Sequence, residues 1–380
     1  MKLSHSILLL SISAAIVPVA NAEIAIDEIG GVKIGFEGLV QTDANWFYND
    51  VVDLKGRGAN GNSNEFELRR AELVLKGQGP GNFNWVLGYD AKADRFLDVN
   101  VRYRFSGDLN QFLHVGQFKQ FNSLDELSSA AHGDFISKAT VTNVYGVSRR
   151  LAVGYGVNTQ QFGAYASYFG RELTRNLANG NGYSMRGTWS PINEEGQILH
   201  LGLAYASHRA KDDTYRARAR PNADLATVRL VDAGLMTDVD RVSMTSFETM
   251  WVNGPVKLQG EYFRGRIGRD AHSTFNSSGY YLSGLWNVTG ETWGYKNGVP
   301  VTSSPDDPMR GMWQLGLRYD NLNLNDGAVQ GGKMGIWTAG ANWYWRSNYK
   351  VALNYVMVNS KRAGINDDPN ILEARLQFYW

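Results

Sequence analysis

The chain lacks cysteine altogether, so it requires no disulfide formation if it is exported. Beyond its first residues it also lacks any apolar run of about 20 residues, which excludes a membrane protein built from helices. It has no Pro-rich or Ser-rich stretch that would mark a linker between domains. Charge of one sign is missing as well, because 38 basic residues face 37 acidic ones. Bulk charge therefore predicts no nucleic-acid partner, and any selectivity must come from local placement.

The first residues are typical of an export signal. A positive start at Lys2 precedes an apolar run over residues 7–20, and Ala20-Asn21-Ala22 forms a small-x-small cleavage site. We expect residues 1–22 to be a cleaved signal peptide and residues 23–380 to form a single domain. A membrane anchor is the alternative, but the apolar run is too short to span a bilayer and no second run follows it.

What the remaining chain contains is alternation. Between residues 97 and 105, apolar side chains face one way and polar ones the other: Leu97, Val99, Val101, Tyr103 and Phe105 against Asp98, Asn100, Arg102 and Arg104. A period of two indicates a strand. A basic residue facing lipid at mid-bilayer costs about 2–4 kcal/mol. We therefore expect the apolar face to meet lipid and the charged face to line a wet interior.

The segments between the alternating runs differ in length. Short turns are expected at 79–82, 107–110, 158–160, 193–196 and 253–255. Longer polar loops are expected at 49–64, 120–148, 171–182, 208–240, 266–274, 325–332 and 359–370. Short turns on one side and long loops on the other are typical of a transmembrane β-barrel. The pattern predicts an all-β, antiparallel barrel of about sixteen strands, a size that leaves an aqueous channel; one connection, 289–309, is longer than this scheme expects.

The last strand supports the barrel, because Leu372, Ala374, Leu376, Phe378 and Trp380 alternate to the final residue. A soluble β-sandwich is the alternative fold. A sandwich would present one polar, solvated sheet face, and would not spread Trp and Tyr along the apolar faces of nearly every strand.

Motifs for catalysis or cofactors are weak. The G-x-G-x-x-G match at 56–61 has no helical pattern after it, so we expect no nucleotide cofactor. The histidines are scattered without metal-ligand spacing, and Ser184 fails the G-x-S-x-G pattern. We therefore expect neither a metal nor an enzyme, although an outer-membrane hydrolase is kept as an alternative from another class.

The densest basic run is Arg216, Arg218 and Arg220. An extended backbone would place these side chains on one face about 7 Å apart. Guanidinium groups at that interval can pass an oxyanion along a channel by successive charge-assisted hydrogen bonds. A basic loop facing anionic lipopolysaccharide is the other reading, and the sequence does not choose between them.

Four motifs in order resemble the phosphate-selective porin O and P family. They are the runs 66–73 (FELRRAEL), 116–127 (GQFKQFNSLDEL), 218–225 (RARPNADL) with 231–234 (VDAG), and 260–263 (GEYF). The chain departs from the family pattern at Asn122, where a proline is usual, and at Asn222 and Asp224, which stand for glutamate and histidine.

The resemblance implies a trimeric sixteen-stranded porin of the bacterial outer membrane, with loops 120–148 and 208–240 folded into the lumen. It implies that Arg70, Lys119, Arg218 and Arg220 are inward cations and that Asp90 is an acid near the narrowest point. With the strand and loop cations, the expected solute pathway comprises Arg70, Arg102, Arg104, Lys119, Lys138, Arg150, Arg216, Arg218, Arg220 and Asp90.

The expected function is passive diffusion of small anions, such as phosphate or phosphorylated solutes. A general or weakly selective porin for small polar solutes is the alternative, because inward cations on the strands are matched by inward acids. Membrane lipid, lipopolysaccharide and two further copies of the chain are the expected partners.

Overall fold

The structure, a computed structural model, describes residues 24–29, 31–57, 61–107, 109–174 and 180–380. Its main feature is a closed antiparallel barrel of 16 strands, which confirms the predicted fold class. No helix in the described part of the chain is long and apolar enough to cross a bilayer. The expected signal peptide, residues 1–22, lies outside the described residues.

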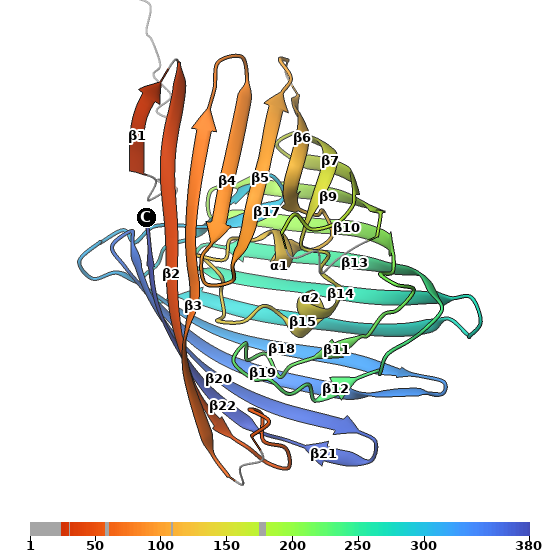
Figure 1. The fold of residues 1–380 in the computed structure, drawn as a ribbon. Helices are drawn as coiled ribbons and strands as arrows, with labels where there is room; N and C mark the ends of the chain where they lie inside the picture. Colours follow the sequence, from red (N-terminus) through yellow and green to blue (C-terminus); the bar gives the residue numbers. More distant parts are fainter. Residues whose placement is uncertain (1–23, 30, 58–60, 108, 175–179) are drawn as a thin grey trace, which may run out of the picture.

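Consecutive barrel strands are neighbours in space, so the chain winds up and down around the barrel (Figure 1). The barrel strands are β2 (Val32–Tyr48), β3 (Ser63–Gln78), β4 (Phe83–Asp90), β5 (Arg95–Arg104), β6 (Asn110–Lys119), β7 (Arg149–Asn158), β8 (Phe162–Phe169), β9 (Gly182–Glu194), β10 (Gln197–Arg209), β13 (Val239–Asn253), β14 (Val256–Arg269), β15 (Phe275–Asn287), β18 (Met312–Asp326), β19 (Val329–Trp345), β20 (Tyr349–Arg362) and β22 (Asn370–Tyr379). Two short strands, β1 (Ile24–Ile29) and β21 (Ile365–Asp367), extend the sheet beside β2 and β20.

The barrel closes where β2 pairs with both β3 and β22. Gly38 and Trp380 exchange backbone hydrogen bonds of 3.0 and 3.2 Å at this seam. A Cβ on Gly38 would lie 2.1 Å from the Trp380 ring, so glycine is required for the indole to lie across β2. Phe36 and Phe378 contact the same indole, and the three rings cover the seam.

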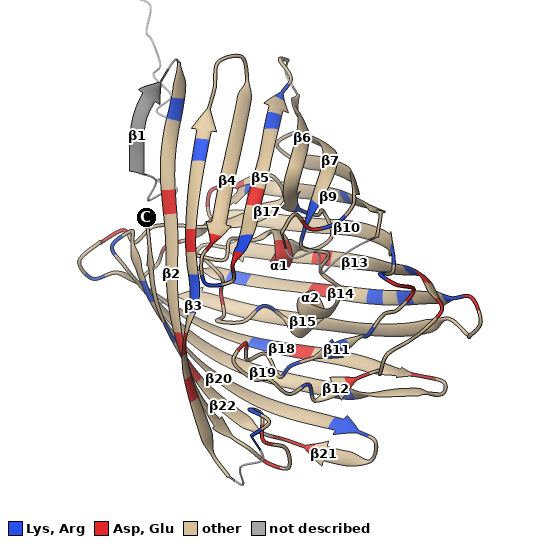
Figure 2. Ribbon diagram, viewed as in Figure 1, with Lys and Arg blue, Asp and Glu red and all other residues tan. Residues whose placement is uncertain are grey.

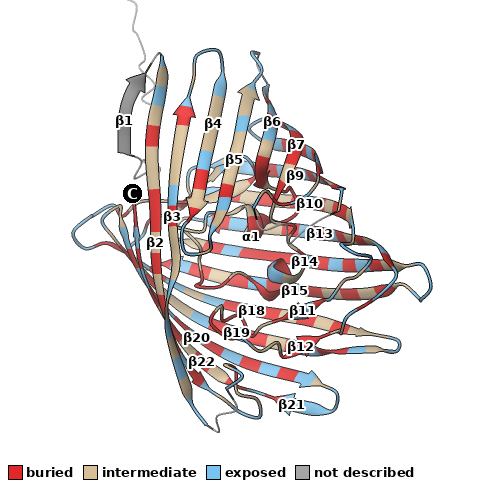
Figure 3. Ribbon diagram, viewed as in Figure 1, coloured by how far each residue is buried: buried red, intermediate tan, exposed pale blue. Residues whose placement is uncertain are grey.

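Buried and exposed residues alternate along the barrel strands (Figure 3). On β20, Leu353 and Tyr355 are exposed, whereas Asn354 and Val356 are buried. The exposed face is apolar and meets lipid, because charged groups there would cost about 2–4 kcal/mol each at mid-bilayer. This agrees with the orientation that the sequence predicts.

Aromatic side chains form two belts on the outer face. Near the short turns, successive ring contacts join Trp313, Trp343, Trp345, Tyr349 and Phe378. On the loop side, ring contacts join Tyr280, Tyr319 and Trp337. Along β19 the belts are separated by the stretch from Trp337 to Trp343, which spans about 20 Å at the usual rise of a strand. The belts therefore bound an apolar band of the height that an outer membrane requires.

A β-bulge corrects the predicted alternation in β5. The pairing of β4 with β5 shifts between Leu87 and Tyr89. Leu97 consequently turns inward, where it is 2% exposed and lies against Gly88, while Phe96 takes the lipid-facing position. The prediction that Leu97 faces lipid is wrong, because the extra residue of a bulge leaves both neighbours chemically plausible on either face.

The predicted loops are correct in order, but some are shorter than expected. β14 runs to Arg269, and a tight turn at Gly327 joins β18 to β19 within the segment predicted as a loop. The long connection at 289–309 instead contains a hairpin, β16 (Trp293–Lys296) paired with β17 (Val299–Thr302).

Labelling of introduced cysteines tests the register of β5, since the chain has no cysteine of its own. We expect Arg102→Cys and Arg104→Cys to react with a water-soluble thiol reagent through the pore. Val101→Cys and Tyr103→Cys should be shielded by lipid because they lie on the opposite face of the strand. Equal labelling at all four positions, measured by mass shift in folded protein in vesicles, would contradict the register.

Candidate functional site

The segment 120–148 lies inside the barrel and carries two short helices, α1 (Leu124–Leu127) and α2 (Thr140–Tyr145). The amides of Leu124 and Asp125 donate to the carboxylate of Glu261 on β14, at 2.9 and 2.8 Å. The amide of Thr140 donates to Asp320 on β18, at 2.8 Å. Both acceptors are buried inward side chains of the wall. The loop is therefore fixed across the lumen.

Basic side chains of the same wall hold the middle of this loop. Lys257 pairs with Asp134 at 2.8 Å, while Lys350, Arg318 and Arg375 donate to the carbonyl oxygens of Gly133, Ser137 and Ile136. Each of these cations is at most 8% exposed. The loop covers the inner face of β14, β18, β20 and β22, and the cations of that face are not available to a solute.

The segment 210–238, which contains the paired strands β11 (Arg218–Ala219) and β12 (Val231–Asp232), also enters the lumen. Asn222 donates to Asp320 at 2.9 Å and accepts from the Thr140 hydroxyl at 2.7 Å. Asp224 accepts two hydrogen bonds from Arg69 on β3, at 3.0 and 2.6 Å. Asn222 and Asp224, the two departures from the family pattern, are thus the residues that anchor this loop to the wall and to the other loop.

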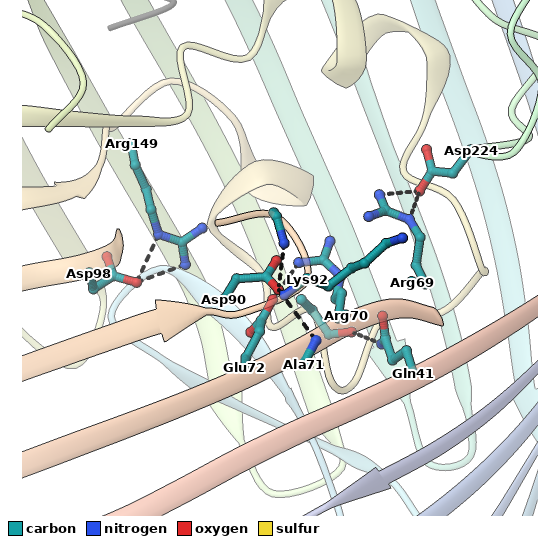
Figure 4. Close-up of polar contacts among 12 residues, drawn as sticks. Gln41, Arg69, Arg70, Ala71, Glu72, Asp90, Lys92, Asp98, Arg149 and Asp224 are labelled. Carbon is teal, nitrogen blue, oxygen red and sulfur yellow. Dashed lines mark hydrogen bonds and ion pairs between the residues drawn. The ribbon is translucent and has the colours of Figure 1, made fainter. Parts of the chain in front are cut away.

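The cations that remain accessible lie on the opposite wall. Figure 4 shows Arg69, Arg70 and Lys92, which come from β3 and the β4–β5 turn, together with Arg149 from β7. The side chains of Arg69 and Arg149 are 27% and 20% exposed, whereas that of Arg186 on β9 is 1% exposed. The open path therefore runs between the two inner loops and the wall of β3 to β7.

A bulge in β3 gives this wall its two adjacent arginines. The pairing of β2 with β3 shifts so that Gln41 lies opposite Arg70 and Thr42 opposite Leu68. Arg69 and Arg70 consequently both point inward, although strict alternation would place one of them in lipid. Sequence reasoning missed Arg69. Two consecutive arginines in an otherwise alternating strand were the available signal, since only a bulge keeps both out of hydrocarbon.

Most accessible cations in the narrow zone have an acidic partner. The pairs are Arg69–Asp224 (2.6 Å), Arg70–Glu72 (2.7 Å), Arg149–Asp98 (2.7 Å), Lys92–Glu67 (2.7 Å) and Lys138–Glu126. Lys119 differs, because its ammonium donates to the carbonyl oxygens of Glu126 and Ser128 at 2.6 and 2.9 Å. The narrow zone is thus rich in cations but nearly neutral in sum.

The other residues of the expected pathway are distributed unevenly. Arg102 and Arg104 face inward near the turn end of β5, and the Arg102 guanidinium lies 4.5 Å from the ring centre of Phe112. Asp90 accepts from the amides of Ala71 and Lys92, at 3.3 and 3.1 Å, and so shapes the β4–β5 turn. Arg150 is 5% exposed and lies against Phe169, away from the accessible cations.

The arginines of the 210–238 loop occupy one face of an extended segment, as their spacing predicts. Ala217 and Ala219 are buried in the core between them. Arg216 is paired with Asp232 at 2.6 Å, but Arg218 is exposed and forms no hydrogen bond or ion pair with any described residue. Partial burial, together with the nearby Arg220 and Arg218, lowers the pKa of Arg229. Arg218, Arg220 and Arg229 therefore form a cluster of cations, which we call the loop arginine cluster.

The β16–β17 hairpin enters the barrel from the turn side. Trp293 is 1% exposed and covers Lys257, whose ammonium is 5.1 Å from the ring centre. Arg186 forms a buried pair with Glu248 at 2.7 Å and donates to the carbonyl of Gly298 at 2.7 Å. The hairpin is thus docked on inward residues of β9, β13 and β14, and it narrows the lumen from the turn end.

Among the described residues, no group of three or more His, Asp or Glu side chains converges in a way that could hold a metal ion. The histidine that lies deepest, His200, contacts Glu248 at 3.3 Å and the Tyr295 hydroxyl at 2.5 Å. It has a structural place under the hairpin and no serine partner is recorded for it.

A family model for phosphate-selective porin O and P matches residues 40–380. The chain belongs to this family. Porin O of Pseudomonas aeruginosa is 27% identical over 229 residues, which cover 52% of each chain. An uncharacterized protein of Caulobacter vibrioides is 27% identical over 322 residues, covering 78% of this porin and 63% of the relative. This porin thus spans between about half and two thirds of the length of these relatives.

Solved structures share the fold at low identity. An anion-selective porin from Comamonas acidovorans has a TM-score of 0.61 at 13% identity, and the match covers 92% of this porin and all of that chain. OmpT of Vibrio cholerae in a trimer form has a TM-score of 0.60 at 11% identity, with 92% and 100% coverage. Family and fold together establish a channel of the bacterial outer membrane and not an enzyme.

The contact that holds α1 predicts how the porin responds to pH. Burial alone would raise the pKa of Glu126, but Lys138 and Lys119 outweigh it and lower the pKa to about 2. A lowered pKa stabilises the fold fully above the unfolded value of about 4.5 and loses that contribution as the pH falls through about 2.

We therefore expect the open-channel current noise of the wild-type porin to stay constant from about pH 8 down to about pH 5. Glu126→Gln should increase the noise throughout this range, because α1 loses its ion pair. A rise in wild-type noise between these limits, recorded in planar bilayers, would show that another group controls the loop.

The position of the hairpin predicts a larger conductance when it is removed. Replacing residues 291–308 by a short Gly-Ser link should raise the single-channel conductance, because the hairpin occupies part of the lumen. Tyr295→Phe removes only the hydroxyl that contacts His200 and is the matched control, with conductance close to wild type. An unchanged conductance in the replacement variant would place the hairpin outside the conducting path.

Proposed function

We propose that this porin conducts small anions by passive diffusion, and that phosphate or other phosphorylated solutes are its preferred cargo. The observation that carries the proposal is the loop arginine cluster, in which Arg218 has no acidic partner among the described residues. Beyond it, Arg69 and Arg70 continue a series of accessible cations into the narrow zone, and Arg102 and Arg104 continue the series toward the turn end.

The physical basis is repeated weak binding. An oxyanion leaving water for a narrow passage regains part of its hydration through charge-assisted hydrogen bonds from guanidinium groups. Conduction requires that each site bind weakly enough for the ion to leave, and several similar sites in series meet that condition. The acids beside Arg69 and Arg70 weaken each site, which favours transfer over retention.

A general or weakly selective porin for small polar solutes is the second candidate. It is favoured by the ion pairs in the narrow zone, because paired charges repel cations less and attract anions less than free arginines. The loop arginine cluster decides between the two candidates, since it is the part of the pathway whose positive charge is not balanced.

We also propose that residues 1–22 are removed on export and that three copies of the chain form a trimer. The apolar run before Ala20-Asn21-Ala22 supports the first proposal. The shared fold with OmpT of Vibrio cholerae, whose structure is described as a trimer form, supports the second. Cross-linking of folded protein followed by electrophoresis tests the trimer, and N-terminal sequencing of the membrane form tests the cleavage.

Changing Arg218 and Arg220 together to alanine tests the selectivity. Even about 1 kcal/mol of lost attraction per site changes anion occupancy about fivefold. The anion-to-cation permeability ratio should fall and phosphate should block chloride current less. The effect should shrink at high salt, because the Debye length falls to about 3 Å at 1 M. Reversal potentials in a salt gradient give the ratio.

The matched control is the double lysine variant, Arg218→Lys with Arg220→Lys. It keeps both charges and removes only the planar fork that binds oxyanions with two hydrogen bonds. We expect it to retain chloride selectivity and to lose part of the phosphate block. An unchanged reversal potential in the alanine variant at low salt would favour the general porin.

A further inference from the structure

The outer surface of the barrel changes character just beyond the loop-side aromatic belt. Tyr262 of β14 lies opposite Tyr280 of β15 at the level of this belt. The next two outward residues of β14 are Arg264 and Arg266, and both are exposed. Phe263, between Tyr262 and Arg264, is fully buried inside the barrel. The two arginines therefore face the membrane and not the lumen.

Two more arginines lie on the same outward strip. Arg209 of β10 is directly opposite Arg241 of β13 in the strand register. Like charges in this position destabilise a sheet unless something neutralises them. Figure 2 shows the basic residues gathered at the loop end of β14. We call Arg209, Arg241, Arg264 and Arg266 the outer arginine patch.

The patch has free hydrogen-bonding capacity. Arg241 donates to the Ser207 hydroxyl at 3.4 Å, whereas Arg264 and Arg266 form no hydrogen bond or ion pair with any described residue. Hydroxyl and amide side chains flank these two arginines across the sheet: Ser243 and Thr245 on β13, and Asn276 and Ser278 on β15. Asp240, at the bulge where β13 begins, is the exposed acid of this strand end.

The depth of the patch identifies what surrounds it. Arg264 is two residues beyond Tyr262, about 7 Å farther along the strand. A basic residue at that level is in the headgroup layer, where it costs about 0–1 kcal/mol instead of the larger mid-bilayer penalty. The anions available at this level on the loop side are the phosphates of outer-leaflet lipid.

We propose that the outer arginine patch binds phosphate groups of lipopolysaccharide. Guanidinium groups bind phosphate through two parallel hydrogen bonds, and the flanking hydroxyls supply further donors. A phosphate held between Arg209 and Arg241 removes the repulsion that their register imposes. A solute in the lumen cannot reach the patch, because the barrel wall separates them. The proposal is therefore independent of the solute that the porin conducts.

Titration of folded, detergent-solubilised porin with purified lipopolysaccharide tests this site. The variant Arg264→Gln with Arg266→Gln should bind about thirtyfold more weakly, the factor that corresponds to about 1 kcal/mol for each basic residue near an anionic membrane surface. Dephosphorylated lipopolysaccharide should bind the wild-type porin as weakly as native lipopolysaccharide binds the variant. Resistance to unfolding in unheated gel samples shows that each variant is folded.

The matched control removes two basic residues at the opposite rim, Arg310→Gln with Arg346→Gln, and should bind lipopolysaccharide like the wild type. Inorganic phosphate at an equal phosphate concentration should not displace the lipid. Equal lipopolysaccharide binding by the patch variant would overturn the proposal. So would displacement by inorganic phosphate, which would indicate a free-anion site, or loss of subunit association with unchanged lipid binding, which would indicate a contact between copies.

Discussion

The hydrocarbon around the barrel is the constraint on which the rest of this structure depends. Because no charged side chain is tolerated at mid-bilayer, the strands turn their basic and acidic residues into the lumen. A charge confined there is stable only if it is hydrated or paired. The two inner loops supply the partners: Asp134 for Lys257, Asp224 for Arg69, and backbone carbonyls for Arg318 and Arg375.

This docking divides the lumen into two unequal halves. The loops and the β16–β17 hairpin cover the inner face from β9 to β22, where the cations are buried and serve the fold. The face from β3 to β7 stays accessible, and there the cations Arg69, Arg70 and Arg149 meet solvent. One wall thus stabilises the narrowing and the other wall forms the path. The same physical rule acts outside, where arginines occur on β14 only after the tyrosine belt has ended.

Much of the fold could be predicted from the sequence because the side-chain period of a strand is local. Alternation identified the strands, their outward faces and their number, and the arginine spacing at 216, 218 and 220 indicated the extended segment whose alanines are buried. Bulges could not be predicted, since one added residue in β3 or β5 moves Arg69 and Leu97 inward without altering composition. Pairings such as Arg216 with Asp232 were also out of reach, because they depend on how a long loop folds back.

The site could be predicted in type but not in arrangement. Arg150 has the same chemistry and strand periodicity as Arg102, yet only Arg102 remains near the accessible lumen. The hairpin at 293–302 was visible only as an overlong turn, because its docking on Arg186 and Lys257 is non-local. Lys138 was identified as the cation of its loop, but its pairing with Glu126 required the helix between them.

The central claim is that unbalanced arginines of the 210–238 loop lie in the conducting path. The most direct measurement is the zero-current potential of single wild-type channels across a gradient of potassium chloride, first at low and then at high ionic strength. The account predicts a potential of the sign for anion preference, which approaches zero as salt screens the arginines and which phosphate alters by competing with chloride. A potential of the opposite sign, or one near zero at low salt, would contradict it.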